Sequence, residues 1–283
     1  MDYVRDVTVN NDGTITVTIP EGSTIITPLQ RQIIQHKKDV KQYIKYKGSN
    51  HPFTFMNVGC DCSDISPEAF CRLVYLSTYA HYGDNVLMAT QRRALNQDDM
   101  MEILRISRST FYSFKNEVMG KYIQFDLGKN AFIISDKAFK KDKLEKKDGN
   151  CWQRLYHNEF RALYNNISPS KHKLLGKMLF LLPHLNIYNN QLCYDRYENN
   201  SKYFQPFTLE DVCVILYSDP IRCHRLMKDL EQLTYSIGGK SKRFCILSED
   251  EKVKDKKVFY NPEVIYRGLD PCTGFTMAFD FLS

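Results

Sequence analysis

The amino-acid sequence predicts an α+β protein, mainly α, in which one unit of three helices and a β-hairpin occurs twice. Ile-Ser-Pro triplets that begin at Ile65 and Ile167 each open an apolar helical stretch, with Ser placed to cap the helix and Pro at its first position. Two further caps are expected in each copy, 11 residues apart: Asn96 and Ser107, then Thr208 and Asp219. Two helices joined by a tight turn at the same repeated spacing indicate a helix-turn-helix.

The first copy is expected to cover 63–140. Its helices would bury Phe70 and Val74, then Met100 and Ile103, then Phe111, Phe114 and Val118, which recur at helical spacing. Two strands at 122–125 and 131–134, joined at 128–130, would complete a winged helix. The wing of such a unit extends a DNA contact beyond the recognition helix.

The second copy is expected to cover 165–268. Helix one would bury Leu174 and Leu175, helix two Leu209, Val212, Ile215 and Leu216, and helix three Cys223, Leu226 and Leu230. A polar connection at 188–205 is longer than its counterpart in the first copy. Wing strands at 244–247 and 258–260 flank a long charged tip.

Three further segments complete the domain organisation. Residues 1–62 are expected to form a β-hairpin around Asn11-Asp12-Gly13, a helix at 27–48 and a short strand at 53–56. This section has little apolar surface, so it would pack against the next domain or a second subunit. Residues 141–164 are expected to be a basic linker, either solvated or in contact with phosphate, and 269–283 a C-terminal tail.

Composition is compatible with an intracellular protein. The 283-residue chain has a net charge of +6, which permits nucleic-acid binding without indicating a fold. Its nine Cys residues are an odd, scattered set that favours a reducing cytosol over a disulfide framework. No signal peptide and no apolar run long enough to span a bilayer is recognised. We therefore expect a soluble, cytoplasmic protein with no membrane partner.

The strand that closes the second copy carries a resemblance. The run Val258-Phe259-Tyr260-Asn261-Pro262-Glu263-Val264-Ile265-Tyr266-Arg267-Gly268 resembles the wing exit of mobile-element winged-helix proteins, the RepL-type plasmid replication proteins and MarR-like phage proteins. The first copy has Ser135-Asp136 where Asn-Pro would stand, so it departs from this pattern. The two-copy layout is similar to Rep_3-type plasmid initiators. The resemblance implies sequence-specific binding of duplex DNA on a phage or plasmid.

Helix geometry selects the side chains expected to contact DNA. Arg suits paired hydrogen bonds to guanine and Asn suits adenine, whereas Lys and Ser more often contact phosphate. The outward residues of the third helices and the wing lysines are Arg108, Ser109, Tyr112, Ser113, Asn116, Lys129, Arg222, His224, Arg225, Lys228, Lys252 and Lys254. The second copy's set is the more cationic, so we expect it to dominate DNA affinity.

Catalytic and metal sites are not expected. Cys60-Asp61-Cys62 with Cys71 and His81 lacks the two Cys pairs of a structural zinc site. No Cys–His spacing supports a nucleophile, and Gly238-Gly239-Lys240-Ser241 lacks the leading Gly of a phosphate-binding loop. The many Tyr residues lack the His-x-His metal motif of a relaxase. The sequence thus predicts no enzyme, no cofactor and no metal.

The functional expectation is a transcriptional regulator or replication initiator, bound to double-stranded DNA in the bacterial cytoplasm and nucleoid. A homodimer is expected, since two-fold proteins commonly read two-fold sites, with possible contact to the host replication or transcription machinery. The alternative is a winged-helix protein-interaction module that does not bind DNA.

Overall fold

The computed structural model describes residues 6–9, 15–18, 52–145, 151–217, 219–249 and 252–266. The chain divides into two compact units, Met1–Tyr43 and Ile44–Ser283, which are described separately. In the first unit, β1 (Asp6–Val9) pairs antiparallel with β2 (Ile15–Thr18), which confirms the expected hairpin strands. The helix expected at 27–48 and the tail at 269–283 lie outside the described residues.

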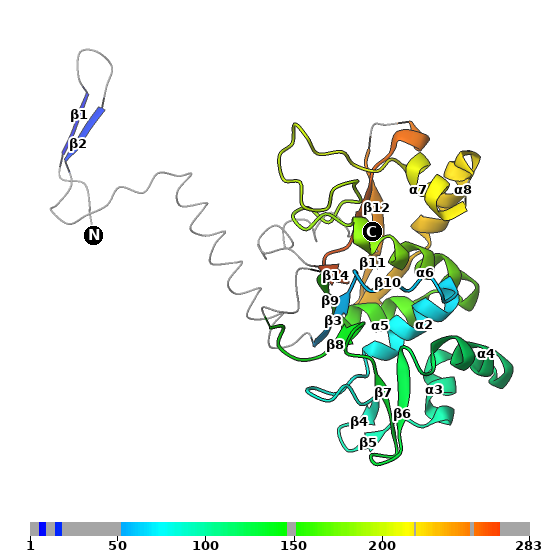
Figure 1. Ribbon diagram of the computed structural model, residues 1–283. Helices are drawn as coiled ribbons and strands as arrows, with labels where there is room; N and C mark the ends of the chain where they lie inside the picture. Colours follow the sequence, from blue (N-terminus) through cyan, green and yellow to red (C-terminus); the bar gives the residue numbers. More distant parts are fainter. Residues whose placement is uncertain are drawn as a thin grey trace. The chain divides into compact units, whose positions relative to one another are not determined.

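A four-stranded antiparallel sheet lies at the centre of the second unit (Figure 1). Its order is β14 (Ile265–Tyr266), β9 (Trp152–Tyr156), β3 (Phe53–Asn57) and β8 (Phe139–Lys140). The strands come from distant parts of the sequence, so no single repeat contains the sheet. β3 precedes the first repeat and β8 closes it, whereas β9 precedes the second repeat and β14 closes it.

The first repeat has the three expected helices and the expected hairpin, together with two short strands at 88–90 and 93–94 that were not expected. They are α2 (Pro67–Ser77), β4 (Met88–Thr90), β5 (Arg93–Ala94), α3 (Gln97–Leu104), α4 (Arg108–Val118), β6 (Ile123–Asp126) and β7 (Ala131–Ile134). The caps form as the sequence indicates, because the side chains of Ser66, Asn96 and Ser107 each accept a backbone N–H of the following turn. β6 and β7 pair as the expected hairpin.

The second repeat follows the same order with additions. Its helices are α5 (His157–Asn166), η2 (Pro169–Lys171), α6 (His172–Phe180), η3 (Leu182–His184), α7 (Leu209–Tyr217), η4 (Pro220–Arg222), α8 (Cys223–Glu231) and η5 (Val253–Asp255). Its strands before β14 are β10 (Thr234–Ile237), β11 (Lys240–Arg243), β12 (Cys245–Leu247) and β13 (Val258–Tyr260). Thr208 and Asp211 bond reciprocally to each other's backbone N–H, so the expected cap of α7 is confirmed. The cap expected from Ser168 does not form, because its side chain makes no capping hydrogen bond to η2.

Matching hydrogen bonds identify the two repeats as copies of one backbone frame. Asn85 and Asn190 both have positive φ, 54° and 55°. The side-chain amide of Asn85 donates to the carbonyl of Phe139, and that of Asn190 donates to the carbonyl of Ile265, each at 2.8 Å. These acceptors begin β8 and β14, so each Asn ties the segment before its repeat's second helix to the central sheet.

The same correspondence extends through the hairpins. The N–H of Leu87 donates to the carbonyl of Phe132 in β7, and the N–H of Leu192 donates to that of Val258 in β13. β6–β7 therefore corresponds to β12–β13, the wing pair expected from the sequence. The hairpin β10–β11 is an insertion that the first repeat lacks, and its turn is Gly238-Gly239, both with positive φ.

One hydrophobic core joins the repeats. α2 and α6 pack against each other beside the sheet (Figure 1), and Phe70 stacks on Phe180 with ring centroids 4.5 Å apart. Gly176 of α6 lies so close to α2 that a Cβ there would overlap the carbonyl oxygen of Pro67. One cluster of buried apolar residues runs from Met56 to Ile265 and draws on both repeats. The repeats are therefore halves of one folding unit.

Three expectations about organisation need correction. Residues 141–164, expected to be a linker, include β9 and most of α5; Leu155, Phe160 and Leu163 of these elements are buried in the core. β3, expected within an N-terminal section ending at 62, belongs to the second unit because its backbone pairs with β8 and β9. Ile215, expected to face inward from α7, is 49% exposed, and Cys213 is buried in the helix instead.

Candidate nucleic-acid interface

The third helix of the first repeat, α4, separates buried and exposed residues as expected. Phe111, Phe114 and Val118 are buried. The predicted contact residues on this helix are all exposed: Arg108, Ser109, Tyr112, Ser113 and Asn116. The Arg108 guanidinium lies 5.9 Å from the centre of the Tyr112 ring, so the start of the helix carries a cation beside an aromatic face.

The helix of the second repeat that corresponds to α4 is α8, and it has the same arrangement with more charge. Cys223, Leu226 and Leu230 are buried, and the predicted residues are exposed: Arg222, His224, Arg225 and Lys228. Arg222 Nε donates to Asp219 Oδ2 at 3.0 Å, and its guanidinium lies 5.4 Å from the Tyr217 ring centre. The side chain of Arg225 is 83% exposed. Arg225 is therefore the more available cation of the two arginines.

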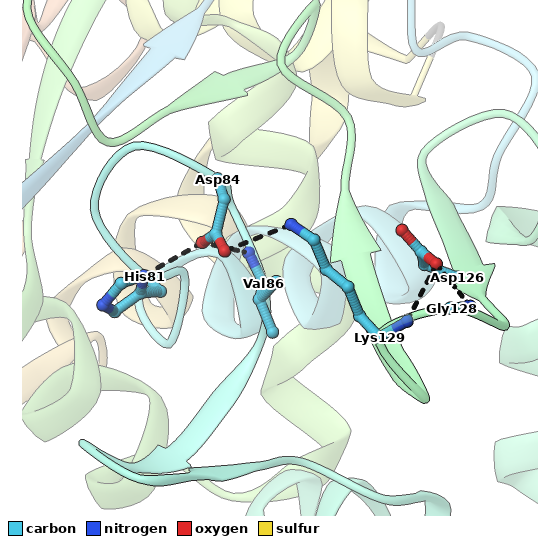
Figure 2. Close-up of polar contacts among 6 residues, drawn as sticks. All are labelled: His81, Asp84, Val86, Asp126, Gly128 and Lys129. Atoms are coloured by element: carbon cyan, nitrogen blue, oxygen red, sulfur yellow. Dashed lines mark hydrogen bonds and ion pairs between the residues drawn. The ribbon is translucent and has the colours of Figure 1, made fainter.

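Lys129, at the tip of β6–β7, is held by a small polar network (Figure 2). Its Nζ lies 3.3 Å from Asp84 Oδ2, and Asp84 Oδ1 lies 2.9 Å from His81 Nδ1. Burial alone would raise the pKa of Asp84, but hydrogen bonds from His81, the Val86 N–H and Lys129 outweigh burial and lower it. The tip of the β6–β7 hairpin thus presents a cation whose position is tied to the loop that follows α2.

The long segment between β12 and β13 of the second repeat presents two exposed lysines, Lys252 and Lys254. Its other two lysines are used within this segment, because Lys256 Nζ donates to the Ser248 carbonyl and Lys257 Nζ to the Asp255 carbonyl. The predicted pair is thus the part of this lysine cluster that faces solvent.

Two surface features were not predicted from the sequence. Exposed Lys240 and Arg243 lie on the inserted strand β11, which a search for a single wing hairpin passes over. The exposed aliphatic residues of α7 and η4, called the apolar group below, are Val214, Ile215 and Ile221, and Ile221 is 88% exposed. Counting from the caps, Glu102 and Ser109 hold the places of Val214 and Ile221 in the first repeat. That comparison is the signal that could have revealed the apolar group.

The sites weighed for catalysis or metal binding have ordinary structural surroundings. Burial raises the pKa of the Cys62 thiol to about 12 and that of Cys193 to about 11. His157 Nε2 lies 2.7 Å from Thr54 Oγ1 in the core, and burial lowers the pKa of His157 to about 2. Among the described residues, no group of three or more His, Cys, Asp or Glu side chains could hold a metal ion.

The comparisons with known proteins give no further guide. No family model, curated protein or solved structure matches the chain. Within the described part of the chain, no helix has both the length and the apolar character needed to cross a membrane.

Proposed function

We propose that the two repeats are tandem winged helices and that the chain binds double-stranded DNA through them. The supporting topology is the order helix, helix, helix and hairpin, which occurs twice with matching hydrogen bonds and with one matching bridge to the second hairpin strand, Val86 to Ile133 and Gln191 to Phe259. Proteins with this order place their third helix in the major groove and their wing against the backbone. The distant sequence resemblance to plasmid and phage proteins supports the same assignment.

The observation that carries the proposal is the match between α4 and α8. Relative to the caps, the exposed residues Tyr112, Ser113 and Asn116 of α4 occupy the same positions as three exposed residues of α8, which are His224, Arg225 and Lys228. All six side chains can form hydrogen bonds with base edges or phosphates. Two helices that bury the same positions and present polar groups at the same outer positions are suited to reading DNA.

Salt dependence tests the proposal directly. Binding of the full chain to a fluorescent duplex from upstream of its own gene is measured by anisotropy across a salt series. Each neutralised phosphate contributes about −0.9 to the slope of log K against log salt, so several contacts give a slope of roughly −4 or steeper. Lys173, an exposed cation of α6 paired with Glu68, provides a control: Lys173→Gln leaves the slope unchanged. A flat salt response contradicts duplex binding.

The biological role follows from where the sites lie. Repeated sites beside an AT-rich stretch favour a replication initiator of a phage or plasmid, and a single palindrome over a promoter favours a transcriptional repressor. Footprinting on the DNA around the gene distinguishes these roles.

A protein-interaction module is the second candidate, and the apolar group of Val214, Ile215 and Ile221 favours it. Contiguous exposed apolar patches are typical of surfaces that meet another protein, and the two elements that carry these side chains, α7 and η4, pack against each other. If the module binds protein alone, Ile215→Ser with Ile221→Ser abolishes partner capture, and no duplex binds either this variant or the parent chain.

A further inference from the structure

We infer that a single chain reads two unlike half-sites arranged as an inverted repeat, with one half-site for each winged helix. The inference rests on the proposed duplex binding and concerns the orientation and composition of the target. It follows from how the repeats are related in space.

The central sheet relates the repeats by an approximate two-fold rotation. Phe55 in the middle of β3 pairs with Arg154 in the middle of the antiparallel strand β9. To either side, Met56 pairs with Phe139 of β8, and Leu155 pairs with Ile265 of β14. β3 and β9 are antiparallel neighbours, and each has the closing strand of its own repeat on its outer side. A half-turn about an axis through the centre of the sheet therefore exchanges the two strands. A simple translation along the chain direction would instead leave β3 and β9 parallel.

Hydrogen bonds at the ends of β3 and β9 are related by the same rotation. The N–H of Asn57 donates to the Ala138 carbonyl at 2.8 Å, and the N–H of Tyr156 donates to the Val264 carbonyl at 3.0 Å. Each bond joins the end of the opening strand to the segment before the closing strand. The rotation therefore extends beyond the sheet into the connections of both repeats.

The helices place both reading surfaces on one side of the sheet. In Figure 1, α2 and α6 lie together beside the sheet, α3 and α4 lie below them, and α7 and α8 lie above. This is the arrangement produced by an axis that passes between α2 and α6. α4 and α8 are thus related as the recognition helices of two subunits are related in a symmetric DNA-binding dimer.

The orientation of the target follows from this relation. Recognition helices related by a two-fold axis meet the two strands of a duplex in opposite senses, so their half-sites form an inverted repeat. The helices present different side chains, however. α8 offers Arg225, suited to guanine, and α4 offers Asn116, suited to adenine. The two half-sites therefore differ in base sequence while remaining inverted in orientation.

One chain is sufficient for such a site. The expected homodimer would supply a two-fold axis, but the repeats already supply one within the chain, and their shared core fixes it. A complex of one chain with one duplex is the stoichiometry that this geometry requires.

The test begins with duplexes selected from a random library by the full chain. Two variants assign the half-sites: Arg225→Ala relaxes base preference in one of them, and Asn116→Ala relaxes it in the other. The selected duplex is then compared with three others, one with a half-site reversed, one with about five base pairs inserted between the half-sites, and one with a half-site scrambled. Five base pairs turn one half-site to the opposite face of the helix, because a full turn takes about 10 base pairs.

We expect one chain per duplex by sedimentation and at least a tenfold loss of affinity for each altered duplex, the loss associated with good base contacts. Equal affinity for the reversed half-site, full affinity for the scrambled one, or two chains per selected duplex overturns the inference while leaving duplex binding in place. Failure to bind any duplex at any salt concentration overturns the proposed function itself.

Discussion

In the first repeat, a short connection that contains the hairpin β4–β5 leads from Leu87 to the cap of α3, whereas in the second a longer segment, 193–207, leads from Leu192 to the cap of α7. The second repeat also has α5 before α6 and the hairpin β10–β11 after α8. Yet the bonds made by Asn85 and Asn190 to their closing strands are the same. The additions lie between elements of the frame, which shows that the buried polar bonds define the repeat and the connections are free to differ.

α4 and α8 also share their buried residue positions and differ at their exposed ones. The buried positions of α4 and α8 correspond, while two matching exposed positions carry Ser113 and Asn116 in α4 but Arg225 and Lys228 in α8. Burial constrains volume and polarity, because a packed core responds to the change of a single methylene group. Solvated positions carry no such constraint and can take whatever chemistry a ligand requires.

Adding a side chain where the repeats meet should produce the largest effect. Gly176→Ala places a Cβ against the Pro67 carbonyl, so α2 and α6 must separate. Overpacking of this kind costs about 3 kcal/mol of the free energy of unfolding. Urea unfolding monitored by circular dichroism measures the loss. Gly128→Ala in the β6–β7 turn is the control and should cost much less, because its nearest contact is the side chain of Asp126. Equal stability of the two variants would show that the repeats are not tightly joined.

Replacing Asn85 or Asn190 by Ala should lower the free energy of unfolding. Ala at 85 or at 190 keeps the positive φ but loses the amide, which leaves buried carbonyls without a donor at a cost of about 1–3 kcal/mol. Asn190 donates to both Tyr260 and Ile265, so its loss should be the greater. Asn190→Gly relieves the backbone strain and isolates the hydrogen-bond part. If Asn190→Ala is as stable as the parent chain in urea, the proposed role of the amide is wrong.

The reading helices should differ in their contribution to DNA affinity. Arg222→Ala with Arg225→Ala removes two cations from the second repeat, and at about 1–3 kcal/mol per good bidentate contact, specific affinity falls at least tenfold. Arg108→Ala with Asn116→Ala should reduce it less, and binding to random duplex should fall less than specific binding in both cases. All four side chains are exposed, so the melting temperature should barely change. Normal binding by both variants would favour the protein-interaction module.

Acid should destabilise the side of the molecule that contains α5. The first helical residue of α5 is His157, whose pKa is lowered to about 2 by burial together with the nearby charges of Lys141 and Arg161. The unfolded state therefore binds the proton more readily, and the stabilising effect of the neutral ring is lost as pH falls below about 6.5. The loss reaches about 1.4 kcal/mol per pH unit. His157→Gln should flatten this dependence between pH 7 and 5.5 in urea unfolding, and an unchanged profile contradicts the assignment.

The smallest expected effect concerns the wing of the first repeat. Lys129→Ala removes one candidate phosphate contact, so the slope of log K against log salt should become about 0.9 less steep, with little change in base preference. Asp84→Asn is the matched control, because it removes the ion pair with Lys129 and leaves the lysine in place. It should not reduce the slope. A change in base preference on loss of Lys129 would place this wing against bases instead of phosphates.

Local signals predicted much of the repeats, because caps and apolar spacing act within a few residues. Asn96, Ser107, Thr208 and Asp219 sit at helix starts as expected. The central sheet was not predicted, since its pairs, such as Phe55 with Arg154, depend on contacts between residues far apart in sequence. The run of lysines after 137 also obscured β9 and α5, whose own apolar alternation is short. Exposure of the predicted contact residues followed from helix geometry, whereas their binding to DNA stays a prediction.

The half-turn that relates β3 to β9 has a consequence for how this molecule can change over generations. In a dimer of identical subunits, each mutation appears on both sides of the axis, so an improvement for one side is imposed on the other. Here both sides are encoded separately in one chain, and a substitution in α8 leaves α4 untouched. Each side can therefore be selected independently, while the common core keeps the two in register.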